Sequence, residues 1–339
     1  MQRCIQLALA GAGNVAPNPM VGAVLVHSNR IIGEGYHQEY GEAHAEVNCI
    51  NSVKAQDNHL IPESTLYVSL EPCAHYGKTP PCTNLIINQK IKKVIIGCAD
   101  VFAKVNGKGI ELLRAAGIEV EVGVLHDECI QLNKRFFTFH SKQRPYIILK
   151  WAQTKNGFLA AKNDERLLIS NDATNRLVHK WRSAEAAILV GYNTALKDDP
   201  QLNSRLYNNK NALRLVIDKQ LQLPETLHVF DGLQKTVVFN YIKNDEQQNT
   251  AYYKIDEQQN TLTQITNYCY NAGLQSILVE GGANTLQQFI SAGLWDEARI
   301  ITNEQLTIQN GLVAPTLTNA ALQRTGNLLT DMIAYYKHD

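Results

Sequence analysis

Four side chains within the first 82 residues have the types and spacing of a metal centre: His44, Glu46, Cys73 and Cys82. Imidazole and thiolate are the usual ligands of zinc, and a catalytic zinc takes three protein ligands and leaves one position for water. His44, Cys73 and Cys82 supply such a set, while Glu46 lies two residues beyond His44 and can carry protons. Each cysteine directly follows a proline, which fixes the backbone that enters it. We therefore expect a catalytic zinc site.

Zinc lowers the pKa of a bound water to roughly 7, which supplies a nucleophile at neutral pH. A His-x-Glu pair followed by Pro-Cys is typical of zinc deaminases, in which this hydroxide attacks a ring carbon and the glutamate passes a proton to the departing amine. One alternative is a structural zinc site, which normally has four protein ligands and closely spaced cysteines. Another is a pair of core cysteines without metal. The apolar strand predicted over residues 64–70 runs straight into Cys73 and favours the catalytic site.

The segments around these residues resemble the bifunctional pyrimidine deaminase/reductase of riboflavin biosynthesis. The similarity rests on PNPMVGAVLV, GEGYHQEYGEAHAEVNCI and EPCAHYGKTPPC, in which eight residues, not two, separate the cysteines. Enzymes of this family remove an amino group from a pyrimidine with a phosphoribosylamino side chain, and then reduce that ribose to a ribityl chain with NADPH. The resemblance implies that four residues bind the pyrimidine substrate: Asn18, His75, Lys78 and Asp100.

Five stretches of the second half resemble the reductase of the same family: KWAQTKNGFLA, RLLISN, WRSAEAAILVGYNTALKDDPQLNSR, LRLVIDKQLQLP and ILVEGGANTL. The resemblance implies a substrate site formed by Lys150, Arg182, Leu202, Arg205 and Glu280. It implies an NADPH site formed by Ala152, Ser170, Thr194, Asp198, Gly281 and Gly282. Guanidinium groups suit the substrate phosphate, and glycines before a helix let the backbone approach a phosphate.

Two positions depart from the family pattern. Asn156 stands where aspartate is usual, and Leu168 where the family often has tryptophan. These departures motivate an alternative, in which the deaminase is active and the reductase is weakened or inactive. A further alternative is a zinc-stabilised nucleotide-binding protein without catalysis.

Alternating strand and helix patterns must position these residues. In the first half we expect a hairpin over 21–27 and 30–36, a helix over 43–53, strands over 64–70, 92–98 and 118–124, and a helix that ends at Gly117. The second half alternates again, with strands over 185–191, 213–218, 235–240 and 275–282. The predicted fold is α/β, with a cytidine-deaminase-like three-layer domain over 1–143 and a dihydrofolate-reductase-like domain over 144–339. Charge and Pro145 mark the boundary.

The composition narrows the class of protein. The chain has 339 residues with 32 Lys+Arg and 32 Asp+Glu, so its zero net charge argues against nucleic acid as a partner. No apolar run reaches the roughly 20 residues of a membrane span, and the short apolar N-terminus predicts a helix rather than a signal peptide. Seven cysteines, an odd number, suit reduced thiols. We expect a cytoplasmic enzyme with a small-molecule partner, and homo-oligomer formation stays open.

Overall fold

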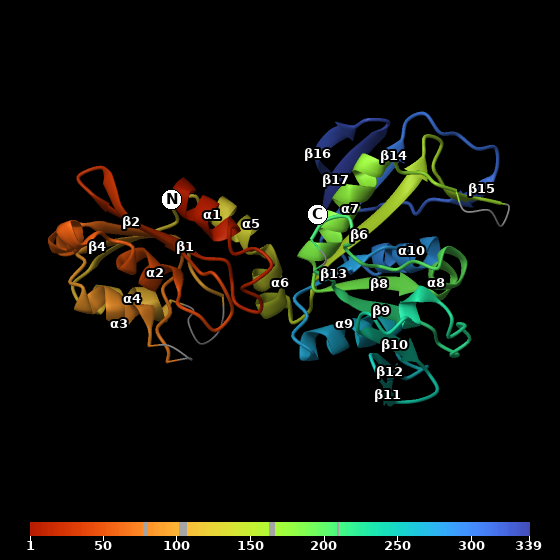
Figure 1. The fold of residues 1–339 in the computed structure, drawn as a ribbon, viewed down its shortest axis with the longest axis horizontal. Coiled ribbons are helices and arrows are strands. Elements are labelled where there is room, and N and C mark those ends of the chain that lie inside the picture. Colours follow the sequence, from red (N-terminus) through yellow and green to blue (C-terminus); the bar gives the residue numbers. More distant parts are fainter. Residues whose placement is uncertain (77–79, 102–106, 163–166, 209) are drawn as a thin grey trace. The chain divides into compact units, whose positions relative to one another are not determined.

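The structure, a computed structural model, describes residues 1–76, 80–101, 107–162, 167–208 and 210–339 (Figure 1). The chain divides into two compact units, Met1–Gln143 and Arg144–Asp339. Within the described ranges, none of the helices combines the length and the apolar character needed to span a bilayer.

A five-stranded sheet in the order β2-β1-β3-β4-β5 forms the centre of the first unit. β1 pairs antiparallel with β2 and with β3, whereas β3, β4 and β5 are parallel. The predicted hairpin and the three predicted strands that follow it are confirmed. Their bounds are β1 Gly22–His27, β2 Arg30–Tyr36, β3 Thr65–Leu70, β4 Lys93–Cys98 and β5 Glu119–Val122.

Helices cover both faces of this sheet, as the three-layer prediction requires (Figure 1). α1 and α5 pack together on one face, and α2, α3 and α4 follow one another on the other face. A large apolar core lies between the sheet and the second group, with Cys49, Ile86 and Leu113 fully buried. The helices are α1 Gln2–Leu9, α2 Ala45–Asn51, α3 Cys82–Asn88, α4 Lys108–Ala115, α5 His126–Leu132 and α6 Lys134–Lys142, with a 3-10 helix, η1, over Ala55–Glu63.

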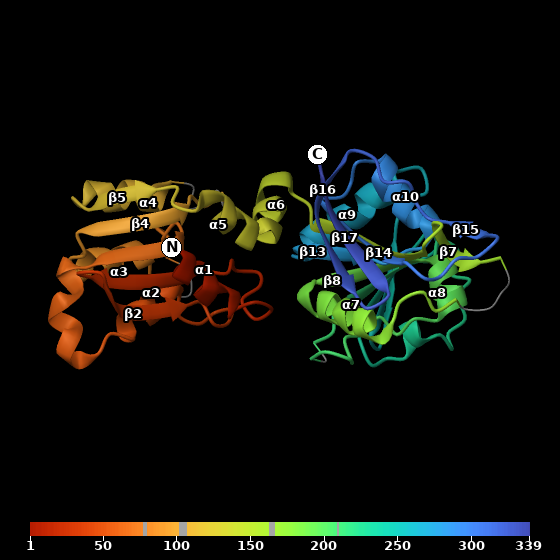
Figure 2. The ribbon, with the colours of Figure 1, turned by 90° about the horizontal axis from the view of Figure 1, so that it is seen from above.

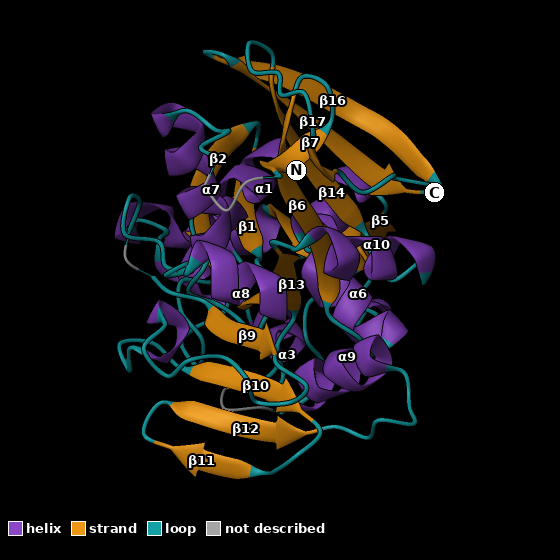
Figure 3. Ribbon diagram, turned by 90° about the vertical axis from the view of Figure 1, so that its right-hand side faces the viewer, coloured by secondary structure: helices purple, strands orange, loops and turns teal. Residues whose placement is uncertain are grey.

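The second unit contains a ten-stranded sheet in the order β11-β12-β10-β9-β8-β13-β6-β14-β17-β16 (Figure 3). The seven strands from β12 to β14 in this order are parallel, and antiparallel strands lie at both edges. The strands are β6 Tyr146–Thr154, β8 Ala187–Gly191, β9 Leu213–Ile217, β10 Thr236–Asn240, β11 Asp245–Gln247, β12 Thr250–Lys254, β13 Ser276–Val279, β14 Glu297–Asn303, β16 Ala320–Leu328 and β17 Asp331–His338. β7 Phe158–Ala161 and β15 Gly311–Val313 form a separate pair.

Two apolar cores lie on opposite faces of this sheet. α9 (Thr261–Asn271) and α10 (Ala283–Ser291) contribute Ile265 and Phe289 to one core. α7 (Asp172–Ala184) contributes Val178 and Trp181 to the other, together with Ala195 of α8 (Tyr192–Asp198). Figure 2 shows α9 and α10 on one side of the strands and α7 on the other. A short 3-10 helix, η2, covers His228–Phe230.

Candidate functional site

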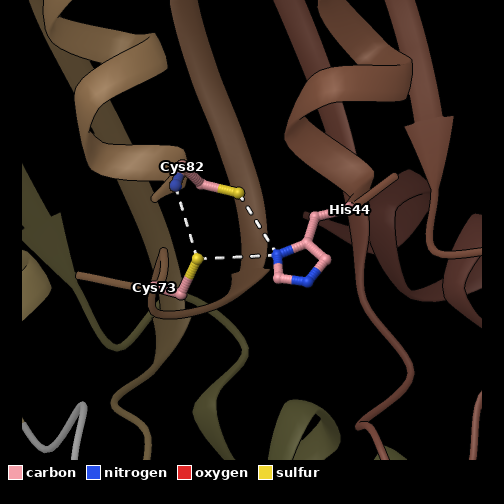
Figure 4. Close-up of side chains that lie close together, drawn as sticks. All are labelled: His44, Cys73 and Cys82. Carbon is pink, nitrogen blue, oxygen red and sulfur yellow. Dashed lines mark hydrogen bonds between the residues drawn. The ribbon is translucent and has the colours of Figure 1, made fainter. Parts of the chain in front are cut away.

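The predicted metal ligands His44, Cys73 and Cys82 lie together in the first unit (Figure 4). His44 Nδ1 is 3.5 Å from Cys73 Sγ and 3.4 Å from Cys82 Sγ. A tetrahedral zinc ion with ligand bonds of about 2.0–2.3 Å separates its ligand atoms by roughly 3.6 Å. The spacing and the donor types therefore fit zinc. Among the residues that the structure describes, this is the one group of at least three metal-ligand side chains whose ligand atoms all lie within 4.8 Å of one another.

The fold brings the three ligands together at the starts of two helices. His44 is the N-cap residue of α2, Cys82 is the first residue of α3, and Cys73 follows the end of β3. The backbone N–H of Cys82 donates to Cys73 Sγ at 3.3 Å. Hydrogen bonding by the Cys82 side chain is the main cause that lowers the pKa of Cys73 to about 4, against the effect of burial. The same interaction raises the pKa of Cys82, so the pair without metal holds one cysteine, Cys73, as the thiolate that binds zinc.

Glu46 lies in the first turn of α2 and is only 3% exposed. Burial, and next the negative charge of Cys73, raises the pKa of its carboxyl group. A raised pKa makes a carboxylate a stronger base, which suits a group that accepts and then releases a proton. This property matches the proton-carrying role predicted for Glu46.

A cavity of about 420 Å³ opens beside the ligands. Six of the residues predicted from the sequence line it: Asn18, His44, Glu46, Cys73, His75 and Asp100. Lys78, the remaining predicted substrate residue of this unit, lies outside the described residues. The cavity therefore combines a buried carboxyl group, side chains of metal-ligand type and several polar groups that suit a polar heterocycle.

His37 also lines the cavity and was missed by the sequence analysis. It is 2% exposed, and its two ring nitrogens lie 3.1 Å from Ala43 O and 3.1 Å from Asn18 Nδ2. Since a carbonyl oxygen can only accept, Nδ1 carries the proton and Nε2 accepts from the Asn18 amide. This contact orients Asn18. His37 stands in the segment GEGYHQEYGEAHAEVNCI that carries the resemblance, and this was the available signal, although its contact with Asn18 joins residues 19 apart.

Glu71 is a second lining residue without a predicted role. Its buried carboxylate accepts four backbone N–H groups, from Asp100 at 3.1 Å, Gly107 at 3.0 Å, Gly109 at 2.9 Å and Ile110 at 3.3 Å. These groups include the first turn of α4, where an anion is favourable. A Cβ atom on Gly109 would lie only 2.1 Å from Pro72 O, so this close approach requires glycine. Glu71 thus fixes the backbone at Asp100 and at the start of α4.

Three predicted substrate residues of the second unit form a buried ion cluster. Arg182 of α7 donates to Glu280 through Nε at 2.6 Å and Nη2 at 2.8 Å. Lys150 Nζ lies 3.7 Å from the same carboxylate. Burial tends to raise the pKa of Glu280, but the charges of Arg182 and Lys150 together lower it to about 2. The cluster lies at the carboxyl end of β13, level with the middle of the neighbouring parallel strand β6, and the carboxyl ends of strands are where open α/β sheets bind ligands.

The predicted cofactor residues Thr194, Gly281 and Gly282 lie next to one another. A Cβ atom on Gly282 would lie 2.9 Å from Thr194 Oγ1, and one on Gly281 would lie 3.5 Å from it. Gly282 is the N-cap residue of α10, so backbone N–H groups without a partner inside the helix lie at the start of a nine-residue helix. This arrangement fits a phosphate of a dinucleotide. Asp198 ends α8, and its charge acts on Lys150, whose pKa burial lowers.

The other predicted residues of this unit lie on different elements and differ in exposure. Ala152 lies on β6 two residues beyond Lys150, on the same face of the strand, and Ser170 precedes the N-cap residue of α7. Arg205 is exposed, and its Nη1 donates to Asn203 Oδ1 at 2.7 Å. Leu202 is only 2% exposed and its side chain belongs to the apolar core. A contact between Leu202 and substrate would therefore have to use its main chain.

The side chain of Asn156 links Thr154 to the backbone of Ile308 by hydrogen bonds. Its Nδ2 donates to Ile308 O at 2.7 Å, and its Oδ1 accepts from Ile308 N at 3.3 Å and from Thr154 Oγ1 at 2.9 Å. An aspartate could not make the first of these bonds, because an ionised carboxylate only accepts. The departure from the family pattern thus has a structural explanation in this chain. Leu168 is 76% exposed.

Two family models match the sequence. Residues 1–98 match the family described as the cytidine and deoxycytidylate deaminase zinc-binding region, and residues 145–304 match the RibD C-terminal domain. The first match covers His44 and both cysteines of the metal site, and the second covers the ion cluster of the second unit.

Known proteins are similar over most of the chain. The riboflavin biosynthesis protein RibD of Aquifex aeolicus is 37% identical over 301 residues, which cover 87% of this chain and 83% of the relative. RibD of Bacillus amyloliquefaciens is 37% identical over 326 residues, which cover 94% and 86%.

Solved structures agree with the sequence relatives. The diaminohydroxyphosphoribosylaminopyrimidine deaminase/5-amino-6-(5-phosphoribosylamino)uracil reductase of Thermotoga maritima has a TM-score of 0.91 at 33% identity, and 100% of this chain and 97% of that chain are covered. RibD of Acinetobacter baumannii has a TM-score of 0.88 at 30% identity, with 99% and 97% covered. The predicted family, fold class, and zinc and NADPH cofactors are confirmed. The chain belongs to the RibD family of riboflavin biosynthesis proteins, which are bifunctional deaminases and reductases.

Proposed function

We propose that the two units act in succession on one small molecule, with residues 1–143 as the deaminase domain and 144–339 as the reductase domain. The first unit removes an amino group hydrolytically from a pyrimidine that carries a phosphoribosylamino side chain. The second unit reduces the ribosyl group to a ribityl chain with NADPH. The observation that carries this proposal is the cavity beside the metal ligands, which is lined by His44, Cys73, Glu46, Asn18, His75 and Asp100.

In the first unit, His44, Cys73 and Cys82 would hold zinc. When bound, zinc supplies a Lewis acid that lowers the pKa of a coordinated water to about 7. Glu46 accepts the proton of the attacking water and delivers a proton to the leaving amine, a double role for which its raised carboxyl pKa suits it.

Polar residues of the cavity orient the pyrimidine. Asn18 uses one amide N–H on His37, so its oxygen and its other N–H remain for the ring edge. His75 and Lys78 contact the ring or the ribosyl phosphate, and Asp100, which lines the cavity, contacts the substrate. Tight positioning brings the amino-bearing carbon beside Glu46 and accounts for a large part of the rate.

In the second unit, Arg182 and Arg205 bind the substrate phosphate, because a guanidinium fork matches phosphate oxygens. Lys150 and Glu280 orient the opened sugar, and Leu202 contributes its main chain. The NADPH site is formed by Ala152, Ser170, Thr194, Asp198, Gly281 and Gly282. Catalysis here depends chiefly on holding the hydride donor close to the carbonyl carbon.

Purified protein tests both steps. With the phosphoribosylamino-pyrimidine as substrate, we expect ammonia release followed by consumption of NADPH. Zinc-loaded protein that releases no ammonia would refute the deaminase assignment. Protein that deaminates but leaves NADPH unchanged on the deaminated intermediate would establish the alternative with an inactive reductase, for which exposed Leu168 remains the motivation.

Two broader properties are part of the proposal. A cytoplasmic location is supported by the seven cysteines, each of which is a free thiol. Assembly into a homo-oligomer is supported by β16, an edge strand whose residues from Leu322 to Asn327 are exposed. Light scattering on the purified chain measures the oligomeric state, and a mass of one chain would refute this part.

A further inference from the structure

His179 is a buried residue of the second unit that has no role in the reaction as proposed above. It is 5% exposed and lies on α7, three residues before Arg182. Residues three apart are neighbours on one face of a helix. His179 is therefore close to the cluster of Arg182, Glu280 and Lys150, and the charges of all three act on its ring, as does that of Arg205.

The imidazole of His179 is an acceptor at one nitrogen. The backbone N–H of Leu206 donates to its Nδ1 at 3.4 Å. Burial, with the positive charges of Arg182 and Arg205, lowers the pKa of His179 to about 4. The ring is consequently neutral near pH 7, with its proton on Nε2.

α7 holds the segment that carries Arg205 at two points. Arg182 Nη1 donates to Asn203 O at 3.3 Å, and Leu206 N donates to His179. The two contacted residues, Asn203 and Leu206, lie on either side of Arg205 in the sequence. The two side chains that contact them, Arg182 and His179, lie one turn apart on α7. Residues 201–204 have no regular secondary structure, and Leu202 has a positive φ of 49°. The position of Arg205 therefore depends on such side-chain contacts.

We propose that His179 is a positioning residue, which holds the Leu206 amide and thereby places Arg205 beside Arg182 for the substrate phosphate. This inference rests on the proposed phosphate-binding role of the two arginines. His179 itself transfers no proton and touches no reacting atom in this proposal. Its effect should appear in the binding of phosphorylated ligands and be transmitted through Arg205.

The test compares His179→Leu with His179→Asn, whose side-chain oxygen can still accept the Leu206 N–H. For the leucine variant we expect KM for the phosphorylated substrate, and Ki for inorganic phosphate as inhibitor, to rise about tenfold, while kcat changes less than twofold. The asparagine variant should keep most of the affinity. KM for NADPH, the deaminase rate of the same chain and the exposed control Arg176→Leu should stay unchanged. Equal losses in both His179 variants, or a loss in kcat alone, would overturn the proposal.

A double-mutant cycle with Arg205→Ala tests the positioning role of His179 separately from the phosphate-binding role of Arg205. If His179 acts through Arg205, His179→Leu adds little to the effect of Arg205→Ala on KM and Ki. Fully additive effects overturn the positioning role and leave the role of Arg205 intact. If Arg205→Ala alone changes neither KM nor Ki, the proposed phosphate site is wrong, and the role of His179 fails with it. Thermal melting of each variant shows that folding is not the cause.

Discussion

The carboxylate of Glu71 is the most densely hydrogen-bonded acidic group described in the first unit, so its replacement by glutamine makes a demanding test. An ionised carboxylate offers about four lone-pair sites, whereas the glutamine amide has one oxygen with two. The side chain keeps its size, so packing is preserved. Of the four backbone N–H groups that Glu71 accepts, at most two would keep an acceptor. The amide NH₂ group would face the others.

The magnitude follows from the two orphaned donors. A buried donor that loses its partner costs about 1–3 kcal/mol, so Glu71→Gln should lower the free energy of unfolding by about 2–6 kcal/mol. This is a large share of the roughly 5–15 kcal/mol that stabilises a typical domain. We expect urea unfolding of the first unit to shift to a clearly lower midpoint, while the transition of the second unit is unchanged.

Hydrogen exchange locates the effect. The amides of Asp100, Gly107, Gly109 and Ile110 should lose protection in Glu71→Gln. The amides of β1 should lose only as much protection as the lower global stability of the unit explains. Glu63→Gln is the matched control, because the Glu63 side chain is 70% exposed. The reasoning would be refuted if the free energy of unfolding of Glu71→Gln lay within about 0.5 kcal/mol of this control and the protection of the α4 amides were unchanged.

Three further predictions concern the two sites. Glu46→Gln should abolish most ammonia release, while zinc content and NADPH oxidation on the deaminated intermediate persist. A chelator should likewise stop ammonia release alone. Loss of both activities would contradict the assignment of the two reactions to separate sites. Asn156→Asp should destabilise the second unit by about 0.5–1.5 kcal/mol in urea unfolding, because the exposed Nδ2 bond to Ile308 O is replaced by two facing acceptors. An unchanged midpoint would contradict a stabilising role for this bond. Between pH 4.5 and about 2, unfolded protein binds a proton at Glu280 that the folded protein does not. Stability of the second unit should therefore fall as pH drops through this window, and a Glu280→Gln variant should lack this component.

The sequence predicted those elements whose apolar runs are short and bounded by turn residues. The β1–β2 hairpin, β3 and β4 have such runs and are found where expected. β16 was not predicted. Its six consecutive residues from Leu322 to Asn327 are exposed and mostly polar, so its sequence lacks the alternation of apolar and polar residues that marks a half-buried strand. Edge strands of this kind are held by pairing with a neighbour, which a single sequence does not reveal.

The metal ligands could be predicted because side-chain type and local spacing limit them. The contacts that orient the site could not, since they join distant segments. Glu71 reaches amides 29 to 39 residues away, and His179 meets an amide 27 residues away. Glu71 opens the segment EPCAHYGKTPPC, but its amide partners lie outside that segment, and His179 lies outside the segments that carry the resemblance. Burial with a specific partner identified them, and both properties exist only in the folded chain.

The placement of two ligands at helix starts has a kinetic consequence. His44 immediately precedes α2 and Cys82 begins α3, and each helix has only seven residues. Terminal turns of short helices fray far more often than a whole domain opens. The residence time of the ion should therefore be limited by local melting of these turns rather than by global unfolding, and metal exchange should accelerate in variants that loosen either turn even when overall melting is unaltered.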